Sequence, residues 1–188
     1  MTMKNKVLHI IRTKFRSLCC RTRGRLLKYY PQITAGKRIY RESNVEMNVA
    51  YGGEIIIGDD CVFRSGCKIL TYGGNVKIGH HCSVNPYTLL YGQGNLTIGN
   101  YVRIAAQCIF IPSNHQFSDT TIPIAKQPLS KKGITIEDDV WVGSGVQILD
   151  GVTIAQGCVI GAGSVVTKST EPYGIYVGSP ARLIKRRK

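Results

Sequence analysis

Phenylalanine and tryptophan are scarce in this sequence. Four Phe and one Trp occur among 188 residues, whereas glycine occurs 21 times. A chain with so little Phe and Trp and so many glycines suits a repetitive fold with thin layers and many tight corners. The length is that of a single domain.

Acidic residues are absent from the first 41 positions. This stretch holds 12 of the 25 lysines and arginines, and residues 181–188 hold 5 more. The body of the chain, residues 42–180, has 8 basic and all 11 acidic residues, a net charge of −3. The basicity belongs to the two ends, which argues against a general polyanion-binding surface. The basic N-terminal stretch also lacks interleaved aromatics on strands and any known motif, so no nucleic acid partner is expected.

Paired cysteine motifs and long apolar runs are missing as well. No C-x-x-C occurs among the seven cysteines, which argues against metal ligation or disulfides and indicates reduced thiols in a reducing compartment. Arg12, Lys14 and Arg16 interrupt the apolar residues near the N-terminus. This segment is therefore neither a signal peptide nor a transmembrane span.

The sequence has instead a strict period of six residues between positions 136 and 166. The units read IEDDVW, VGSGVQ, ILDGVT, IAQGCV and IGAGSV, and an aliphatic residue opens each one. A small or short-branched residue follows four places later in every unit. A helix would show apolar spacings of three and four, and a lone strand would alternate. The period predicts short strands joined by corners, three units to a coil, with the coils stacked.

The same period runs upstream from Ile57. The expected inward positions there are Ile57, Phe63, Ile69, Ile78, Val84, Leu90, Ile98, Ile104 and Phe110. Five cysteines fall on the small fifth position, where a compact apolar side chain is favoured: Cys61, Cys67, Cys82, Cys108 and Cys158. Residues 112–133 carry no such period. We expect them to form a loop that leaves the scaffold, and long loops of this kind are commonly functional.

These units resemble those of the hexapeptide-repeat acyltransferases, which have the form [LIV]-G-x-x-[small]-x. The run DDVWVGSGVQILDGVTIAQGCVIGAGSVVTK and the later VGSPARLIK resemble most closely the branch of galactoside, maltose, xenobiotic and cell-surface polysaccharide acetyltransferases. The resemblance implies an all-β solenoid, a left-handed parallel β-helix, over residues 50–180. A basic amphipathic helical segment at 1–35 and a short basic tail at 181–188 would flank it. The resemblance also implies acetyl-CoA as acyl donor, no metal, and a homotrimer with sites between subunits.

The loop of residues 112–133 begins PSNHQFSD, and its NH-x-x-x-D pattern resembles the catalytic loop of this family. The resemblance makes His115 the general base for an acceptor hydroxyl, a role that neutral imidazole fills near neutral pH. Direct attack of the hydroxyl on the thioester needs no covalent enzyme intermediate. Asp119 is a candidate to orient the ring and stabilise the imidazolium; a contact within the loop is its alternative role.

Candidate donor-binding residues come from the last coils and the C-terminus. Trp141, the only Trp, takes the outward sixth position of its unit, and in the resembling proteins this side of the coil lines the pantetheine channel. Ser144 is also a candidate donor to the developing oxyanion. Small residues for close approach, and residues that match the family's CoA-phosphate positions, complete the set: Gly143, Ser144, Ala162, Gly163, Thr167, Lys168, Arg182 and Lys185. For the last two, a solvated tail is the alternative.

Three residues are candidates for acceptor binding. Asn85 aligns with an asparagine that contacts sugar in the galactoside and maltose enzymes, although a corner role fits it equally. Tyr87 and Asn114 are the other two. The maltose-type N-terminal segment is replaced here by the basic segment, which favours a larger or lipid-linked glycan over a free sugar. An amino sugar or an antibiotic hydroxyl is the alternative acceptor.

Residues 1–30 are expected to form one or two amphipathic helices, broken at Gly24 and stopped by Pro31. The apolar stripe begins with Val7, Ile11, Phe15 and Leu18, set among basic residues, and is extended by Leu8, Leu26, Leu27 and Tyr30. Two interpretations stay open: a helix packed on the β-helix or on a neighbouring subunit, and an interfacial helix that holds the protein at an anionic membrane surface. The expected location is the cytoplasm, in the second case at the inner face of the membrane.

Two other function classes are alternatives. Zinc-dependent γ-type carbonic anhydrases share the scaffold and need three histidine ligands, two of them spaced five apart. His80, His81 and His115 are present, but position 120 is Thr and no H-x4-H occurs. A non-catalytic scaffold is the other alternative, against which the loop with His115, Trp141 and Lys168 argues.

Overall fold

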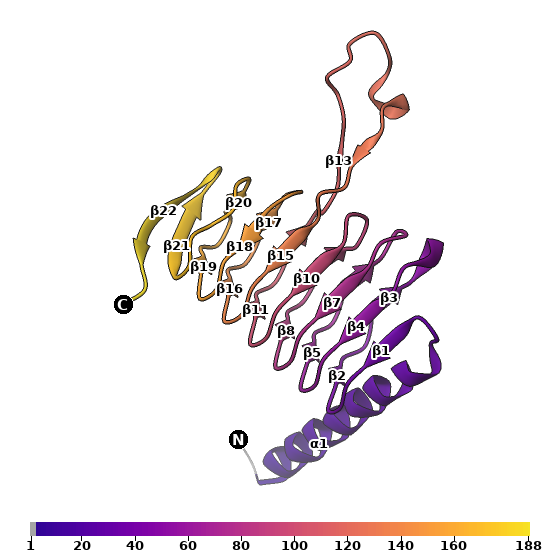
Figure 1. Ribbon diagram of the computed structural model, residues 1–188. Helices are drawn as coiled ribbons and strands as arrows, with labels where there is room; N and C mark the ends of the chain where they lie inside the picture. Colours follow the sequence, from indigo (N-terminus) through magenta and orange to yellow (C-terminus); the bar gives the residue numbers. More distant parts are fainter. Residues whose placement is uncertain (1–2) are drawn as a thin grey trace.

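The computed structural model describes the backbone of residues 3–188 and the side chains of residues 13–49 and 51–188. The chain forms a left-handed parallel β-helix, a triangular prism of three sheets (Figure 1). A helix lies against its N-terminal end, and one long loop projects from its side. The predicted all-β solenoid is confirmed.

Three sheets form the faces of the prism. Sheet A contains β1 (Ile33–Ala35), β4 (Ile55–Ile57), β7 (Val76–Ile78), β10 (Leu96–Ile98), β15 (Ile134–Ile136) and β18 (Thr153–Ile154). Sheet B contains β2 (Tyr40–Arg41), β5 (Val62–Phe63), β8 (Ser83–Val84), β11 (Arg103–Ile104), β16 (Trp141–Val142), β19 (Val159–Ile160), β21 (Gly174–Gly178) and β22 (Ala181–Arg186). Sheet C contains β3 (Glu46–Asn48), β6 (Lys68–Leu70), β9 (Leu89–Tyr91), β12 (Ile109–Phe110), β17 (Gln147–Ile148) and β20 (Val165–Val166).

Each coil runs from sheet A to sheet B to sheet C, so the prism has three corners. We name them the A–B, B–C and C–A corners after the sheets that they join. Equivalent residues of successive coils stack along a corner, and their backbone groups pair with the coils on either side. Two side chains at the same corner of adjacent coils are therefore neighbours. Side chains at different corners face different directions.

Burial confirms the six-residue period. Every predicted inward residue from Ile57 to Phe110 and from Ile136 to Val166 is at most 3% exposed. Fully burying a side chain of this size stabilises the fold by about 1.5–3 kcal/mol. The five hexad cysteines are buried free thiols, and burial raises the pKa of Cys67 to about 12. These cysteines therefore act as small apolar core residues.

The β-helix begins one coil earlier than the sequence pattern indicated. Strands β1, β2 and β3 pair in register with β4, β5 and β6, so the solenoid starts at Ile33 rather than at residue 50. In this coil the inward positions hold Ala35, Arg41 and Met47. None of these is a branched aliphatic residue; in this coil the six-residue period is carried instead by the buried Ile33, Ile39 and Val45, two positions earlier in each unit.

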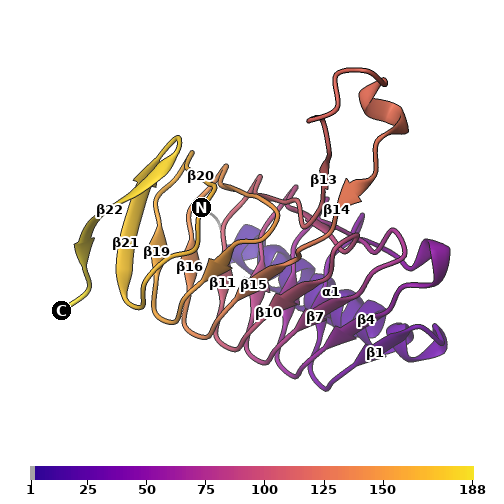
Figure 2. The same ribbon diagram turned by 45° about the horizontal axis from the view of Figure 1, so that its top comes forward.

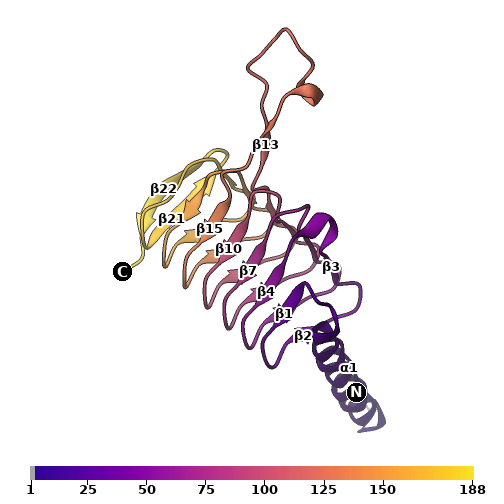
Figure 3. The same cartoon turned by 45° about the vertical axis from the view of Figure 1, so that its right-hand side comes forward.

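The C-terminal segment is a strand rather than a solvated tail. Strand β22 pairs antiparallel with β21, and a turn with a cis Ser179–Pro180 peptide joins them. This hairpin covers the last coil at the end of the stack opposite the helix (Figure 3).

Helix α1 (Met3–Arg25) and the 3₁₀ turn η1 (Leu26–Tyr29) lie against the first coil. Cys20, Gly24 and Leu27 form the buried face, with helical spacings of four and three. Gly24 is a point of close approach, since a Cβ there would lie 2.2 Å from the carbonyl oxygen of Ile39. The helix therefore continues through Gly24, where the sequence pattern predicted a break.

Among the residues of the predicted apolar stripe whose side chains are described, which exclude Leu8, only Leu27 belongs to the packed face of this helix. Phe15 and Leu18 are 68% and 61% exposed, and Val7 and Ile11 lie outside the residues whose side chains are described. In the described part of the chain, no helix has the length and apolarity needed to cross a membrane.

A buried carboxylate ties α1 to the prism. Glu42, with its side chain 6% exposed, accepts hydrogen bonds from Arg16 of the helix at 3.0 Å and from Arg64 of the second coil at 2.9 Å. It also accepts one from the backbone N–H of Ser65 at 3.0 Å. Burial alone raises the pKa of Glu42, but these donors and charges outweigh burial and lower it.

We expect Glu42→Gln to lower the free energy of unfolding at pH 7 by roughly 1–3 kcal/mol, because it removes the charge that two guanidinium groups face. The folded-state pKa is lowered, so the stabilisation is present above the ordinary carboxylate pKa and is lost as pH falls through the folded value. Urea unfolding should therefore separate the wild type and the variant at pH 7, and the two stabilities should converge as the pH falls below the lowered folded-state pKa of Glu42. Glu46→Gln, which breaks the exposed pair with Lys68, is the matched control. Equal losses in both variants would contradict the anchoring role.

Candidate active site

The loop of residues 112–133 leaves the C–A corner and stands clear of the prism in three views (Figures 1, 2 and 3). Its two limbs pair as short antiparallel strands, β13 (Asn114–His115) and β14 (Leu129–Ser130). At its base the loop crosses Gly94, where a Cβ would lie 1.6 Å from the carbonyl oxygen of Pro112. Only glycine allows this crossing.

Asp150 fixes the returning limb of the loop. Its carboxylate accepts hydrogen bonds from the hydroxyl of Ser130 and from the backbone N–H groups of Lys132 at 2.8 Å and Gly133 at 2.9 Å. Sequence analysis missed this role, because Asp is an ordinary corner residue in the hexads. The paired limbs and this anchor give the loop a defined direction away from the prism.

His115 is exposed on the outgoing limb, directly beside Asn114. Farther along, Asp119 accepts hydrogen bonds from the N–H and hydroxyl of Thr121 at 2.8 and 2.6 Å, which lower the pKa of Asp119. Gln127 bonds to the backbone of Asp119 on the other side. Asp119 therefore caps a turn at the loop tip, the alternative role weighed above, and its action on the imidazole stays a prediction.

The loop also exposes apolar side chains. Phe117 is 68% exposed, Ile122 41% and Ile124 54%. Exposed apolar residues grouped on a projecting segment are typical of a surface that another protein chain covers.

Most of the predicted donor-binding residues gather along the B–C corner. Gly143, Ser144, Ala162 and Gly163 occupy this corner on two adjacent coils, next to Trp141 on β16. Trp141 is 57% exposed, as its outward position predicts. A Cβ on Gly143 would lie 2.6 Å from the backbone N of Ala162, whereas one on Gly163 would meet nothing within 4 Å. The B–C corner is thus tightly packed between its coils at Gly143 and open to the outside at Gly163.

Two acceptor candidates lie on the same corner, farther toward the N-terminus. The side-chain amide of Asn85 donates to the carbonyl oxygen of Ile104 on the next coil at 2.8 Å. Tyr87 is exposed, has a φ of 60° and covers Gly66. Asn85 thus has a corner contact, and its role toward a sugar stays a prediction.

The remaining donor candidates lie elsewhere. Thr167 and Lys168 are exposed at the C–A corner after β20, and Arg182 and Lys185 are exposed on β22. Within one chain, His115 projects from the C–A corner, whereas Trp141 and the small residues line sheet B and the B–C corner. A single chain therefore carries the two halves of the candidate site on different edges of the prism.

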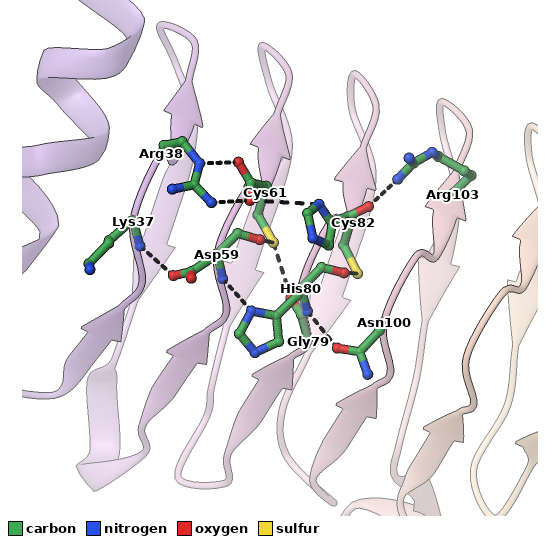
Figure 4. Close-up of polar contacts among 11 residues, drawn as sticks. Lys37, Arg38, Asp59, Cys61, Gly79, His80, Cys82, Asn100 and Arg103 are labelled. Carbon is green, nitrogen blue, oxygen red and sulfur yellow. Dashed lines mark hydrogen bonds and ion pairs between the residues drawn. The ribbon is translucent and has the colours of Figure 1, made fainter.

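The A–B corner carries a polar ladder that sequence analysis did not anticipate (Figure 4). Asp59 Oδ1 accepts from the N–H of Lys37, and His80 Nδ1 accepts from the N–H of Asp59 at 3.0 Å. Asn100 Oδ1 in turn accepts from the N–H of His80 at 2.8 Å. His80 is therefore part of a backbone-capping stack, on a different corner from the loop that carries His115.

Comparison with known proteins shows similarity to bacterial transferases and acetyltransferases. The model of the bacterial transferase hexapeptide family (six repeats) matches residues 133–168. The galactoside O-acetyltransferase of Escherichia coli K12 is 33% identical over 88% of this chain and 78% of its own length. A probable acetyltransferase of Mycobacterium tuberculosis is 31% identical over 72% of this chain, and the match spans only 43% of that relative.

Among solved structures, AntD, an N-acyltransferase from Bacillus cereus in complex with dTDP and 3-hydroxybutyryl-CoA, has a TM-score of 0.75 at 26% identity. The match covers 88% of each chain. The stacked coils, the projecting loop and these similarities agree, and the chain belongs to the hexapeptide-repeat acetyltransferase family.

Proposed function

We propose that this protein is an acetyl-CoA-dependent O-acetyltransferase that acts on a hydroxyl group of a sugar or a cell-surface glycan. The observation that carries the proposal is the exposed His115 on a rigidly anchored loop, in a chain that also presents an open corner of small residues beside its only Trp. The galactoside relative acts on a sugar, and the AntD complex holds an acyl-CoA and a nucleotide.

In the proposed reaction a neutral nitrogen of His115 takes the proton of the acceptor hydroxyl as its oxygen attacks the thioester carbonyl. The hydroxyl of Ser144 would donate to the oxyanion that forms. The carbon–sulfur bond then breaks, and the CoA thiolate takes up the proton from the imidazolium. The cations Lys168, Arg182 and Lys185 would bind the phosphates of CoA.

The proposed site forms between subunits of a homotrimer. The loop of one subunit would reach the B–C corner of its neighbour, which brings His115 to Trp141 of another chain. The exposed Phe117, Ile122 and Ile124 support this arrangement, since contact with a neighbouring subunit would cover them.

An amine acceptor is the second candidate, which the similarity to an N-acyltransferase favours. We also propose that residues 1–30 attach the protein to an anionic membrane surface, which suits a lipid-linked glycan. Support comes from the outward apolar side chains of Phe15, Leu18 and Tyr29.

Release of CoA from acetyl-CoA should be measured with free sugars, nucleotide-linked sugars and amino sugars, and lipid-linked glycans as acceptors. We expect turnover with at least one hydroxyl acceptor, and mass spectrometry of the product should show an ester. An amide product would instead establish the amine acceptor. Failure to bind acetyl-CoA in calorimetry would contradict the proposed function and favour a non-catalytic scaffold.

A further inference from the structure

A basic groove lies where α1 meets the first coil, at the A–B corner. Its volume is about 710 Å³, within the range of pockets that bind small ligands. Its floor is apolar and comes from the backbone and side chains around Ala35, Ile39 and Val62. Its rim carries cations from two elements, namely Arg21, Arg25 and Lys28 of the helical segment and Lys37 of the first coil.

The side chains of these four rim cations form no salt bridge among the described residues, although the Asp59 carboxylate accepts a hydrogen bond from the backbone N–H of Lys37. The salt bridges of this region join Arg16 and Arg64 to Glu42, and Arg38 to Asp60. Asp60 is the only acid that lines the groove, and the bidentate pair with Arg38 neutralises it. Four cations without salt bridges around a concave apolar floor attract an anion with an apolar part; Lys28 lies over the ring of Tyr29, a contact that leaves its charge in place.

The helix orients this rim. Arg21, Arg25 and Lys28 recur at spacings of four and three, one residue after the buried Cys20, Gly24 and Leu27. The rim cations therefore flank the packed face. Phe15, Leu18 and Tyr29 lie on the side away from the prism and are 61–70% exposed. A helix with an apolar outer side and a cationic flank matches the interface of an anionic bilayer.

We propose that the basic groove binds the phosphate group of an anionic membrane lipid while the outer side of α1 enters the bilayer surface. The phosphate meets the rim cations, and the first carbons of the lipid meet the apolar floor. This inference rests on the proposed membrane attachment of residues 1–30 and is independent of acetyl transfer. The groove lies at the A–B corner, whereas the proposed catalytic residues belong to the loop at the C–A corner and to the B–C corner.

The test is co-sedimentation of the full-length protein with vesicles of phosphatidylcholine, with and without phosphatidylglycerol. We expect binding only with phosphatidylglycerol. Arg25→Gln combined with Lys37→Gln should weaken it about thirtyfold, as expected for two cations near an anionic surface. The matched control, Lys77→Gln with Lys188→Gln, removes the same charge from exposed positions away from the groove and should weaken binding less than threefold. If the groove variant and the control variant lost vesicle binding equally, the groove would not be the binding site, and only diffuse electrostatic attraction to the membrane would remain.

Calorimetry with inorganic pyrophosphate separates a lipid phosphate from a soluble one. The wild type and Phe15→Ser with Leu18→Ser should both bind pyrophosphate, whereas the groove variant should not. The Phe15 and Leu18 variant should lose vesicle binding. If the wild type bound pyrophosphate but not the vesicles, the lipid assignment would be overturned. A change of oligomeric mass in the Phe15 and Leu18 variant would also overturn it, since a second subunit would then cover these two side chains. The groove variant should still transfer acetyl groups to a soluble acceptor at the wild-type rate. This result would show that lipid binding at the groove and acetyl transfer are independent.

Discussion

Replacing His115 with alanine is expected to lower kcat for acetyl transfer by about 10²–10⁴-fold, the contribution of a positioned general base. The imidazole is exposed on the outgoing limb of the loop, and no packing depends on it in the described structure. The loss should therefore appear in turnover rather than in folding. CoA release at saturating acetyl-CoA and acceptor measures it.

Two controls accompany this variant. The melting temperature and the affinity for acetyl-CoA should stay at wild-type values, because neither the loop anchor at Asp150 nor the B–C corner is changed. Asn114→Ala, one residue away on the same strand, tests whether any change on this limb has the same effect. A kcat within threefold of wild type for His115→Ala would remove the histidine from the mechanism.

Asp119→Asn separates the two roles of Asp119. An asparagine oxygen still accepts the bonds from Thr121, so the turn at the loop tip persists. A fall in kcat with an unchanged melting temperature would then report the lost charge beside the imidazolium. An unchanged kcat would restrict Asp119 to its turn contact.

The hexads made the prism predictable because each inward side chain stacks on an equivalent one in the next coil. The prediction failed at the two ends of the stack, where this requirement ends. The first coil is covered by α1 on one side and tolerates Ala35, Arg41 and Met47 at inward positions. The last coil is covered by the β21–β22 hairpin, whose antiparallel pairing leaves no period of six.

The helix shows a different limit. Phe15 and Leu18 of its apolar stripe face outward, whereas the packed face uses Leu27 of that stripe together with Cys20 and Gly24. Glycine and cysteine contribute little to an apolar pattern, yet close contact with the backbone of Ile39 requires a residue without a side chain. Amphipathic spacing identified the helix but not which face the protein covers.

The candidate site was predictable residue by residue but not as an arrangement. Position six of a hexad predicts that Trp141 points outward, and 57% exposure agrees. The long gap in the period predicts that the loop leaves the scaffold. The direction of the loop depends on Gly94, Gly133 and Asp150, which resemble ordinary corner residues. Sequence alone could not show that the two halves lie on different edges.

Those separate edges lead to the second large effect, which concerns mixed oligomers. His115→Ala removes the base, and Ala162→Trp places a large side chain on the exposed B–C corner, where the donor is proposed to bind. Each variant alone should be inactive. Coexpressed in equal amounts they should regain about one quarter of wild-type activity, because a site built from two subunits takes an intact loop and an intact corner with independent chances of one half.

A second mixture makes the result quantitative. Wild type coexpressed equally with the doubly substituted chain, His115→Ala with Ala162→Trp, should show about one quarter of full activity if loop and corner come from different subunits, and about one half if they come from one chain. His115→Ala coexpressed with His115→Gln should stay inactive, since no intact loop is present. If the first mixture regained no activity and the second showed one half of full activity, each active site would lie within a single chain. The loop would then have to fold back around the prism from the C–A corner to the B–C corner, against the paired limbs and the Asp150 anchor that now direct it outward.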